Sequence, residues 1–331
     1  MPFSIRFLGT SAARPTVERA VSAIALIREG ETLLFDCGEG TQRQMMRYGI
    51  SFGLDDIFIT HTHSDHILGL TGLLRTLSLQ GRTEPLRLWG PRGSAKVLRQ
   101  CIELGGDRIG YTVNVTEIEA GAVLQRKDYD IATFPVDHRG VRAVGYRIAE
   151  HDRLGRFNPE LARAMGVPEG PLWGRLHRGE TVTLPDGREV SPESLVGGAR
   201  RGRKVVLTGD TRPCEATIAA AWDADVLVHE ATFSADEAER ARETGHSTAE
   251  EAASVARAAG VRRLVLTHIS ARYSRDWGAL EAEARAIFPV TTIARDGTEI
   301  VLPLTEELAA IESSAPPEDV DAPTADARAP R

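Results

Sequence analysis

Three histidines and an aspartate stand within six positions of the stretch THTHSDHILGL, residues 60–70. They are His61, His63, Asp65 and His66, and they include a third of the nine histidines of the chain. Imidazole suits zinc and other borderline divalent metals, and its mixture with carboxylate is typical of catalytic rather than structural zinc. Four such side chains are more than one protein-bound catalytic metal normally takes. The cluster therefore indicates two ions.

Paired metals carry a particular chemistry. Two divalent ions about 3.5 to 4 Å apart lower the pKa of a bridging water and neutralise charge that builds on phosphoryl or acyl oxygens. The cluster thus predicts a hydrolase. Asp65 would orient the attacking water or accept its proton, beyond any role as a ligand. The alternative interpretation is a polar loop that happens to be rich in histidine.

The cluster stands where a strand gives way to a helix. Apolar runs at 4–9, 22–27 and 32–38 predict a meander of strands, followed by a helix at 41–48 and a strand at 56–60. A helix then starts near His66 and runs through LGLTGLLRTLSL. Side chains at the carboxyl end of a strand in an open α/β sheet point into an unoccupied crevice. Because His61 and His63 are two positions apart along the strand and its turn, we expect them to point to the same side.

The second half of the chain repeats this order of elements. The patterns predict strands at 204–210, 225–232 and 263–270, and a helix at 247–260. Each strand again ends in a polar residue of a type that binds metals. Two sheet-containing halves with flanking helices predict an α/β fold, a four-layer αββα sandwich with the site in the cleft between the sheets. Periodicity alone would not distinguish this arrangement from a three-layer fold.

Composition places the chain among ordinary globular proteins. Its 331 residues suffice for a large core, and they contain neither an apolar run of membrane-spanning length nor a signal-like start. The three cysteines stand far apart, which argues against a disulfide framework and against a thiolate metal cage. We therefore expect a protein of the reducing cytoplasm that has no membrane partner.

Two segments depart from the pattern of the main domain, which is expected to span residues 1–304. Residues 151–203 are dense in Gly and Pro, and residues 151–204 carry 10 basic against 7 acidic side chains, a net charge of +3. They predict a flexible arm inserted between two core strands. Residues 305–331 carry 7 acids and 2 arginines, a net charge of −5, with almost no large apolar residues after Ile311. This composition predicts a disordered, dispensable tail.

The motifs together resemble the metallo-β-lactamase superfamily, whose signature His-x-His-x-Asp-His is complete at residues 61–66. The resemblance implies three further ligands at later strand ends, and the chain offers His138 in FPVDHRG, Asp210 in LTGDTRP and His268 in LTHIS. It also implies two zinc ions per subunit, with manganese as the alternative. One ion would be held by His61, His63 and His138, and the other by Asp65, His66 and His268, with Asp210 bridging both.

Further segments resemble ribonuclease Z, the endonuclease that trims the 3′ trailer from precursor tRNA. FLGTSAARPT, LLFDCGEGTQRQM, HEATF (229–233), GHSTAEEAA (245–253) and LTHISARY (266–273) carry this resemblance, which spans residues 4–303. It implies cleavage that leaves a tRNA 3′-hydroxyl and a trailer 5′-phosphate. It also implies a homodimer in which the arm of one subunit, with its GVPEGPLWGRL stretch, clamps precursor tRNA for the partner's active site.

The HEATF and GHSTAEEAA segments suggest a proton donor. A departing ribose 3′-oxygen needs a proton, which His246 could supply if Glu230 holds it in the cationic form. The alternative is that His246 merely precedes a helix cap, because Ser247 or Thr248 before AEEAA is a good capping sequence. Arg272 and Tyr273 follow the last predicted ligand and are weaker candidates for contacting a phosphate or stacking on a base.

Two other functions stay open on the residues alone. One is a small-molecule hydrolase of the same fold, acting on a phosphodiester, lactone or thioester, which would have no need of a basic arm. The other is an RNA-binding module without catalysis. The complete set of ligand positions argues against the second.

Overall fold

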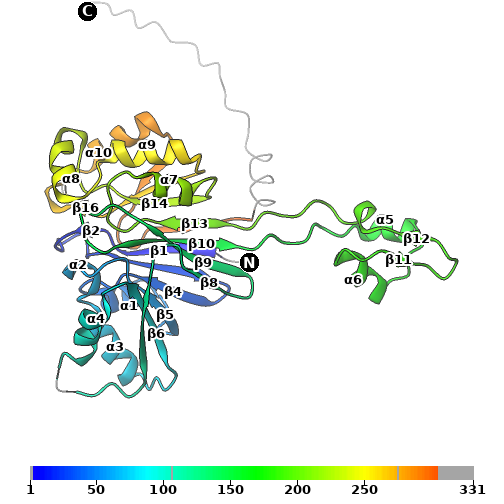
Figure 1. Cartoon of the computed structure of the whole chain (residues 1–331), viewed down its shortest axis with the longest axis horizontal. Helices are drawn as coiled ribbons and strands as arrows, with labels where there is room; N and C mark the ends of the chain where they lie inside the picture. The colour runs from blue at the N-terminus through cyan, green and yellow to red at the C-terminus, as the bar shows by residue number, and fades with distance from the viewer. Residues whose placement is uncertain (1–2, 106, 274–275, 305–331) are drawn as a thin grey trace, which may run out of the picture.

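The computed structural model describes residues 3–105, 107–273 and 276–304. The tail predicted at 305–331 lies outside these residues. Two seven-stranded sheets face each other, and helices cover the outer face of each (Figure 1). The four-layer αββα sandwich predicted from the two halves of the sequence is confirmed. In the described part of the chain, no helix has the length and apolar character needed to cross a membrane.

The first sheet combines the N-terminal half with one strand from the end of the domain, in the order β18-β1-β3-β4-β5-β6-β7. β1, β3 and β4 form an antiparallel meander, and β4 to β7 run parallel. Helices α1 (Thr41–Arg47), α3 (Leu70–Leu79) and α4 (Ala95–Glu103) cover its outer face. The strands are β1 (Phe3–Gly9), β3 (Ala23–Arg28), β4 (Glu31–Phe35), β5 (Leu54–Phe58), β6 (Leu86–Pro91), β7 (Val113–Ile118) and β18 (Glu299–Val301).

The second sheet has the order β17-β15-β14-β13-β10-β9-β8. β8, β9, β10 and β13 pair antiparallel, whereas β13, β14, β15 and β17 run parallel. Helices α7 (Glu215–Ala221), α9 (Ala249–Ala259) and α10 (Gly278–Ile287) cover its outer face. The strands are β8 (Val123–Gln125), β9 (Tyr129–Pro135), β10 (Val144–Glu150), β13 (Lys204–Leu207), β14 (Val226–Glu230), β15 (Leu264–Thr267) and β17 (Thr291–Ile293).

Aromatic and aliphatic side chains fill the space between the two sheets. Phe35 and Phe58 stack with their ring centroids 5.1 Å apart, and Tyr146 of the second sheet meets both rings edge-on. The buried hydroxyl of Tyr146 donates a hydrogen bond of 2.8 Å to the carbonyl of Ile59. Because Ile59 stands two residues before His61, this bond fixes the end of β5 against the second sheet.

The structure corrects two details of the predicted elements. The single helix predicted from His66 is divided into α2 (Ser64–Ile67) and α3. The chain turns between them at Gly69, where an added Cβ would lie 2.0 Å from the Gly38 carbonyl oxygen. The strands predicted at 56–60 and 204–210 end at Phe58 and Leu207, so His61, His63 and Asp210 lie on loops. The two-residue period of a strand therefore does not explain why His61 and His63 come together.

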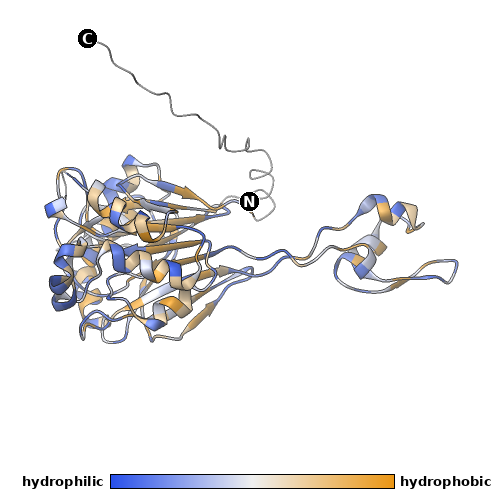
Figure 2. Cartoon of the chain, turned by 90° about the horizontal axis from the view of Figure 1, so that it is seen from above, coloured by the Kyte–Doolittle hydropathy of each residue, from blue (hydrophilic) through white to orange (hydrophobic). Residues whose placement is uncertain are grey.

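Residues 151–203 connect β10 to β13 and project from the body as a long arm (Figures 1 and 2). The outer part folds into α5 (Pro159–Ala164), α6 (Pro171–His177) and the hairpin of β11 (Val182–Thr183) and β12 (Glu189–Val190). The arm has a small core of its own, formed by Ala162, Val167, Leu176, Val182, Leu184, Val190 and Leu195. Apolar residues that are too scattered in sequence to predict elements meet here.

A buried carboxylate in the middle of β5 links the two sheets. Asp56 is fully buried and accepts hydrogen bonds from Arg87 of β6 at 2.7 and 2.6 Å. It also accepts one from the Trp89 indole at 2.7 Å and one from Arg126, after β8, at 3.1 Å. One charge thus satisfies donors from both layers.

Replacing this carboxylate should weaken the fold. We expect Asp56→Ala to lower the free energy of unfolding, measured by urea denaturation, by about 3 kcal/mol, because it leaves buried donors and two guanidinium groups without their acceptor. The matched control is Asp55→Ala. The Asp55 side chain is 65% exposed and forms an ion pair of 3.3 Å with Arg82, so its removal should change stability by less than about 1 kcal/mol. Equal losses in the two variants would contradict this role of Asp56.

Candidate metal centre

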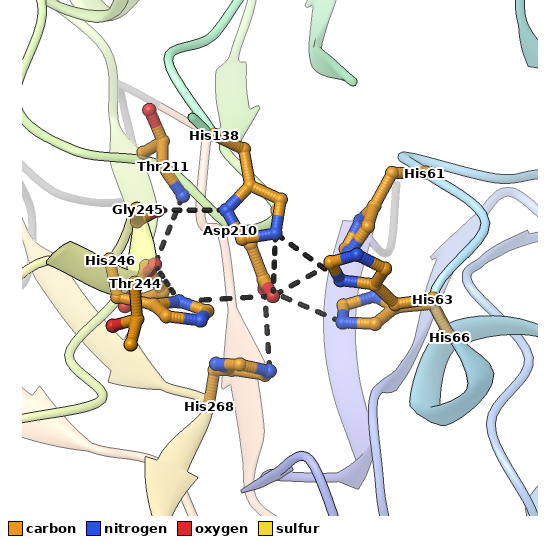
Figure 3. Close-up of polar contacts among 12 residues, drawn as sticks. His61, His63, His66, His138, Asp210, Thr211, Thr244, Gly245, His246 and His268 are labelled. Atoms are coloured by element: carbon orange, nitrogen blue, oxygen red, sulfur yellow. Dashed lines mark hydrogen bonds and ion pairs between the residues drawn. The ribbon is translucent and has the colours of Figure 1, made fainter. Parts of the chain in front are cut away.

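The seven predicted ligands meet at one end of the sandwich, where strands of both sheets end. Four come from the segment after β5, and the others precede β10, follow β13 and follow β15. Imidazole rings surround the carboxylate of Asp210 in the resulting cluster (Figure 3). His63 is exposed at its rim. The six buried members are His61, Asp65, His66, His138, Asp210 and His268.

Asp210 lies between two groups of these side chains. Its Oδ2 atom is 3.6 Å from Nε2 of His61 and 3.9 Å from Nε2 of His138. Its Oδ1 atom is 3.4 Å from Nε2 of His66 and 3.4 Å from Nε2 of His268. Each oxygen of one carboxylate therefore faces a different group.

The grouping is the same when potential ligand atoms are gathered by distance. In each group these atoms lie within 4.8 Å of one another. A further group joins Asp210 and His268 to Glu230 and His246. The two groups that contain only predicted ligands are His61, His63, His138 and Asp210, and Asp65, His66 and His268.

Several of these atoms have no hydrogen-bond partner within the protein. Among the described residues, Nε2 of His61, Nε2 of His66 and Oδ1 of Asp210 are buried and accept or donate no hydrogen bond. Buried polar atoms are normally paired. Three unpaired nitrogen and oxygen atoms that converge on one space fit divalent cations, which bind imidazole nitrogen and carboxylate oxygen. The cluster has the composition of a metal-binding site.

The remaining ring nitrogens of the buried histidines have partners that orient the rings. Nδ1 of His66 lies 2.8 Å from Asp36, and Nδ1 of His138 lies 2.7 Å from the carbonyl of Gly245. Nδ1 of His268 lies 2.9 Å from the hydroxyl of Thr232. Such partners fix which nitrogen of an imidazole faces a metal. Our sequence analysis missed Asp36, although a polar residue at the end of the strand predicted at 32–38 was a usable signal.

Burial and neighbouring charges act differently on the members of the cluster. Burial lowers the pKa of His61 well below its usual value, so this ring is neutral and its lone pair is available. Burial acts in the same direction on His66, but the carboxylates of Asp210 and Asp36 outweigh it and raise the pKa of His66. Burial would raise the pKa of Asp210, yet the surrounding histidines hold that pKa well below its usual value. Asp210 therefore stays ionised.

His246 stands beside the ligands and is held by Glu230. Its Nδ1 atom is 2.7 Å from Oε1 of Glu230 and 3.9 Å from Oδ2 of Asp210. Burial opposes the charged form, but the Glu230 carboxylate outweighs it and raises the pKa of His246 to about 9. The helix cap is formed by Thr248, whose side chain accepts from the Glu251 N–H. The capping interpretation therefore does not use the His246 ring.

Glu230 is itself fixed by the backbone around it. The N–H groups of Thr211, Thr232 and Ser247 donate to its carboxylate at 3.0, 3.2 and 3.1 Å, and the Thr232 hydroxyl donates at 2.7 Å. Glu230 is 1% exposed. A buried carboxylate with this many donors has one fixed position, and it fixes the ring of His246 in turn.

Arg272 and Tyr273 face a neighbouring carboxylate. The Arg272 guanidinium pairs with Glu237 and lies over the Phe233 ring. The Tyr273 hydroxyl donates to Glu237 at 2.6 Å and lies 2.8 Å from the Ser234 hydroxyl. These contacts place the two side chains next to the segment at 229–233, and not within either group of ligand atoms.

The arm leaves the body at the end of the second sheet that is remote from the ligands. β13 begins at Lys204 beside the arm and leads to Asp210, and β10 runs from the side of His138 to Glu150. Helix α2 and strand β16 (Ile269–Ser270), which flank the ligands, lie on the side of the body away from the arm (Figure 1). β13 itself spans about 10 Å at about 3.3 Å per residue, and three loop residues then lead to Asp210, so the arm and the ligands lie at opposite ends of this strand.

Comparison with known proteins places this geometry in a family. A family model described as "Beta-lactamase superfamily domain" matches residues 194–269, and one described as "Anti-Pycsar protein Apyc1" matches residues 3–151. The chain is 68% identical over 310 residues to a protein named "Ribonuclease Z" from Gemmatimonas aurantiaca, covering 93% of this chain and 99% of the relative. It is 53% identical over 304 residues to a "Ribonuclease Z" from Myxococcus xanthus, covering 91% and 98%.

Solved structures agree with this result. The short form of human tRNase Z matches with a TM-score of 0.66 and 28% identity, covering 91% of this chain and all of the other. The metallo-β-lactamase fold protein YhfI from Bacillus subtilis matches with a TM-score of 0.66 and 19% identity, covering 91% and 99%. Because its identity is only 19%, the likeness to YhfI shows the fold alone.

The position of Asp210 between the two groups gives a prediction for metal content. We expect Asp210→Ala to lose nearly all bound metal, since its oxygens face both groups, whereas His138→Ala should disturb only one group. Mass-spectrometric metal analysis of protein purified without chelators measures this. His177→Ala is the control, because this ring lies in the arm, 2.9 Å from the Gly155 carbonyl. An Asp210→Ala protein with the metal content of the unaltered chain would show that Asp210 is not a ligand.

Proposed function

The chain belongs to the ribonuclease Z family, and from this premise we propose that it is a metal-dependent endoribonuclease that removes the 3′ trailer from precursor tRNA. The products are a tRNA with a 3′-hydroxyl and a trailer with a 5′-phosphate. The observation that carries this proposal is the carboxylate of Asp210, with one oxygen toward each of two groups of ligand atoms.

The metals are two zinc ions per subunit in this proposal, with manganese as the alternative. A set of imidazole and carboxylate ligands without thiolate favours catalytic zinc. When bound, such a pair lowers the pKa of a water molecule and neutralises charge on the phosphoryl oxygens. His61, His63 and His138 would hold one ion, and Asp65, His66 and His268 the other, with Asp210 shared.

Asp65 would orient the attacking water and take up its proton. Its Oδ2 atom accepts a hydrogen bond of 2.8 Å from the Ala13 N–H and lies 3.3 Å from Nε2 of His268. Burial would raise the pKa of Asp65, but its hydrogen bond to His268 and the charges of the nearby histidines hold that pKa well below its usual value. The carboxylate is therefore ionised, which is the form required both of a ligand and of a group that orients the attacking water.

His246 would complete the reaction at the leaving group. The water oxygen bonds to phosphorus while the bond from phosphorus to the ribose 3′-oxygen breaks, and the 3′-oxygen needs a proton. Glu230 engages Nδ1 of His246 at 2.7 Å, which leaves Nε2 to donate that proton. The pair follows the general arrangement in which a carboxylate orients an imidazole and stabilises its charge.

Replacing the proposed proton donor should lower the rate of cleavage for one of two substrates and leave the other rate nearly unchanged. We expect His246→Asn to lower kcat for precursor tRNA by about 100-fold or more, because the alkoxide leaves without a proton. Hydrolysis of bis(p-nitrophenyl) phosphate should be nearly unchanged, since nitrophenolate leaves unprotonated. The test is to measure the steady-state rates of the variant on both substrates, together with its metal content. Equal losses on both substrates would remove the assignment of His246 as the donor.

We further propose that the arm grips tRNA for the active site of a partner subunit in a homodimer. The arm of a single chain joins β10 and β13 at the ends opposite to its own ligands, and it projects from the body on the side away from α2 and β16 (Figure 1). The site that it could serve is therefore that of a second copy. The reducing cytoplasm is the proposed location, because Cys37, Cys101 and Cys214 are all unpaired.

Excising the arm should also affect the activity on the two substrates differently. The two segments of the arm pair beside the cut, where the backbones of Arg153 and Arg200 exchange two hydrogen bonds of 2.8 Å, so residues 155–198 can be removed and the ends joined. We expect kcat/KM for precursor tRNA to fall by about 100-fold or more, because the folded outer part of the arm no longer contacts the substrate. Hydrolysis of bis(p-nitrophenyl) phosphate should persist.

Mixed dimers test whether the arm acts on its partner. Chains without the arm, exchanged with Asp210→Ala chains, should regain cleavage of precursor tRNA well above that of either variant alone. In such a dimer an intact arm faces an intact ligand cluster. Loss of small-substrate hydrolysis in the arm deletion, or no regain in the mixture, would count against this arrangement.

A further inference from the structure

The net positive charge of the arm is confined to its stem. We define the stem as residues 151–156 and 197–203, and the tip as residues 157–196. The stem carries five arginines and one aspartate, a net charge of +4, whereas the tip carries four arginines and six acids, a net charge of −2. Ion pairs within the tip join Arg163 to Glu169 at 2.6 Å and Arg175 to Glu180 at 2.8 Å. The stem is therefore the part of the arm that attracts polyanions.

Two stem arginines are occupied by acids of the body. Arg203 is 3% exposed, and its Nε donates to Glu150 at 2.7 Å. Arg201 pairs with Asp225 at 3.1 Å. Arg153 differs, because among the described residues its buried Nε and Nη2 atoms have no hydrogen-bond partner. Buried donors of a charged group normally meet an acceptor, so this part of the stem suits an acidic group from elsewhere.

The C-terminal segment begins beside the stem. β18 pairs antiparallel with β1, and the Leu302 N–H then donates to the Phe3 carbonyl at 2.8 Å. The carbonyl of Leu302 accepts a hydrogen bond of 2.9 Å from Nη1 of Arg203, a stem residue. The chain thus leaves the described structure in contact with the stem and at the end of the body remote from the ligands.

The residues that follow have charge opposite to the stem. Residues 305–331 contain seven acids, all between Glu306 and Asp326, and the two arginines of the segment come after them. The net charge is −5 against +4 for the stem. Twenty-seven residues reach at most about 95 Å when extended, and a stem strand of seven residues at most about 25 Å. Tethering at Leu302 gives the acids an effective concentration in the millimolar range.

We propose that the acidic segment 305–331 binds the basic stem of its own chain and competes there with the phosphates of the substrate. The inference rests on the proposed function, since only an enzyme that acts on a polyanion is restrained by such a competitor. The competition concerns binding and not chemistry, because the stem lies at the end of β13 opposite to the ligand cluster. It weakens with added salt, since the Debye length is about 10 Å at 0.1 M and shorter above that.

Truncation tests the competition. Steady-state kinetics on precursor tRNA compare the full chain with a chain that ends at Leu304, at 50 and 300 mM salt. We expect truncation to lower KM by about 5-fold at the lower salt and by less than about 2-fold at the higher, with kcat unchanged. An unchanged KM at the lower salt, or an equal change at both salts, would overturn the proposal.

Variants that keep the length of the acidic segment separate the effect of its charge on KM from the effect of its size. One variant converts the acids to amides (E306Q, E307Q, E312Q, E318Q, D319N, D321N and D326N) and should match the truncated chain. Its counterpart removes the two arginines (R328Q and R331Q), makes the segment more acidic and should raise KM above that of the full chain. A full-length amide variant with the KM of the unaltered chain would overturn the electrostatic account.

A binding measurement without RNA separates this proposal from the proposed function. A labelled peptide of residues 305–331 is titrated with the chain that ends at Leu304, and fluorescence anisotropy is read at both salts. We expect binding at 50 mM salt that Arg153→Gln weakens and that Arg163→Gln, in the tip, leaves unchanged. A chain that binds the peptide but does not cleave precursor tRNA keeps the contact and loses the proposed function. A chain that cleaves but binds no peptide overturns the contact alone.

Discussion

The carboxylate of Asp210 is the charge on which the rest of the site depends. It is 2% exposed, and its two oxygens face different groups of histidines at 3.4 to 3.9 Å. An ionised carboxylate in such surroundings would be costly without nearby positive charge. The clustered histidines supply part of that charge, and divalent ions would supply the remainder. The same carboxylate that is costly for the fold thus makes the site suited to metal.

The sandwich holds this arrangement by bringing strand ends from two sheets to one place. Side chains that are more than two hundred positions apart meet because β5, β13 and β15 end on the same side of the interior. Contacts across the layers keep the ends in register, among them the bond from Tyr146 to the Ile59 carbonyl at 2.8 Å. Within β5, Asp56 joins donors from both sheets. The arm and the last described strand leave from the end of the body opposite to the ligands, so in the proposed function substrate binding by the arm is separated in space from the chemistry.

The sequence supports prediction of the ligands better than of their surroundings. The spacing at His61 to His66 is a complete signature, and the later ligands follow in the order that the resemblance requires, so the layers of the fold and the members of the cluster could be predicted. The place of Asp36 near a predicted strand end marked it as a candidate, but its partner could not be predicted, because no spacing records the contact of 2.8 Å with His66. The break at Gly69 depends on a close approach to the Gly38 carbonyl. The core of the arm forms from residues that are scattered along the chain. The net charge of the whole arm also does not show that the stem is positive and the tip negative.

The central claim is that two metal ions lie on either side of Asp210. Anomalous diffraction from crystals of the native protein, recorded on both sides of the zinc absorption edge, tests it most directly. The account predicts two peaks about 3.5 to 4 Å apart, one beside His61, His63 and His138 and the other beside Asp65, His66 and His268, with a carboxylate oxygen of Asp210 next to each. No peaks at the zinc or manganese edge, or peaks remote from Asp210, would contradict it.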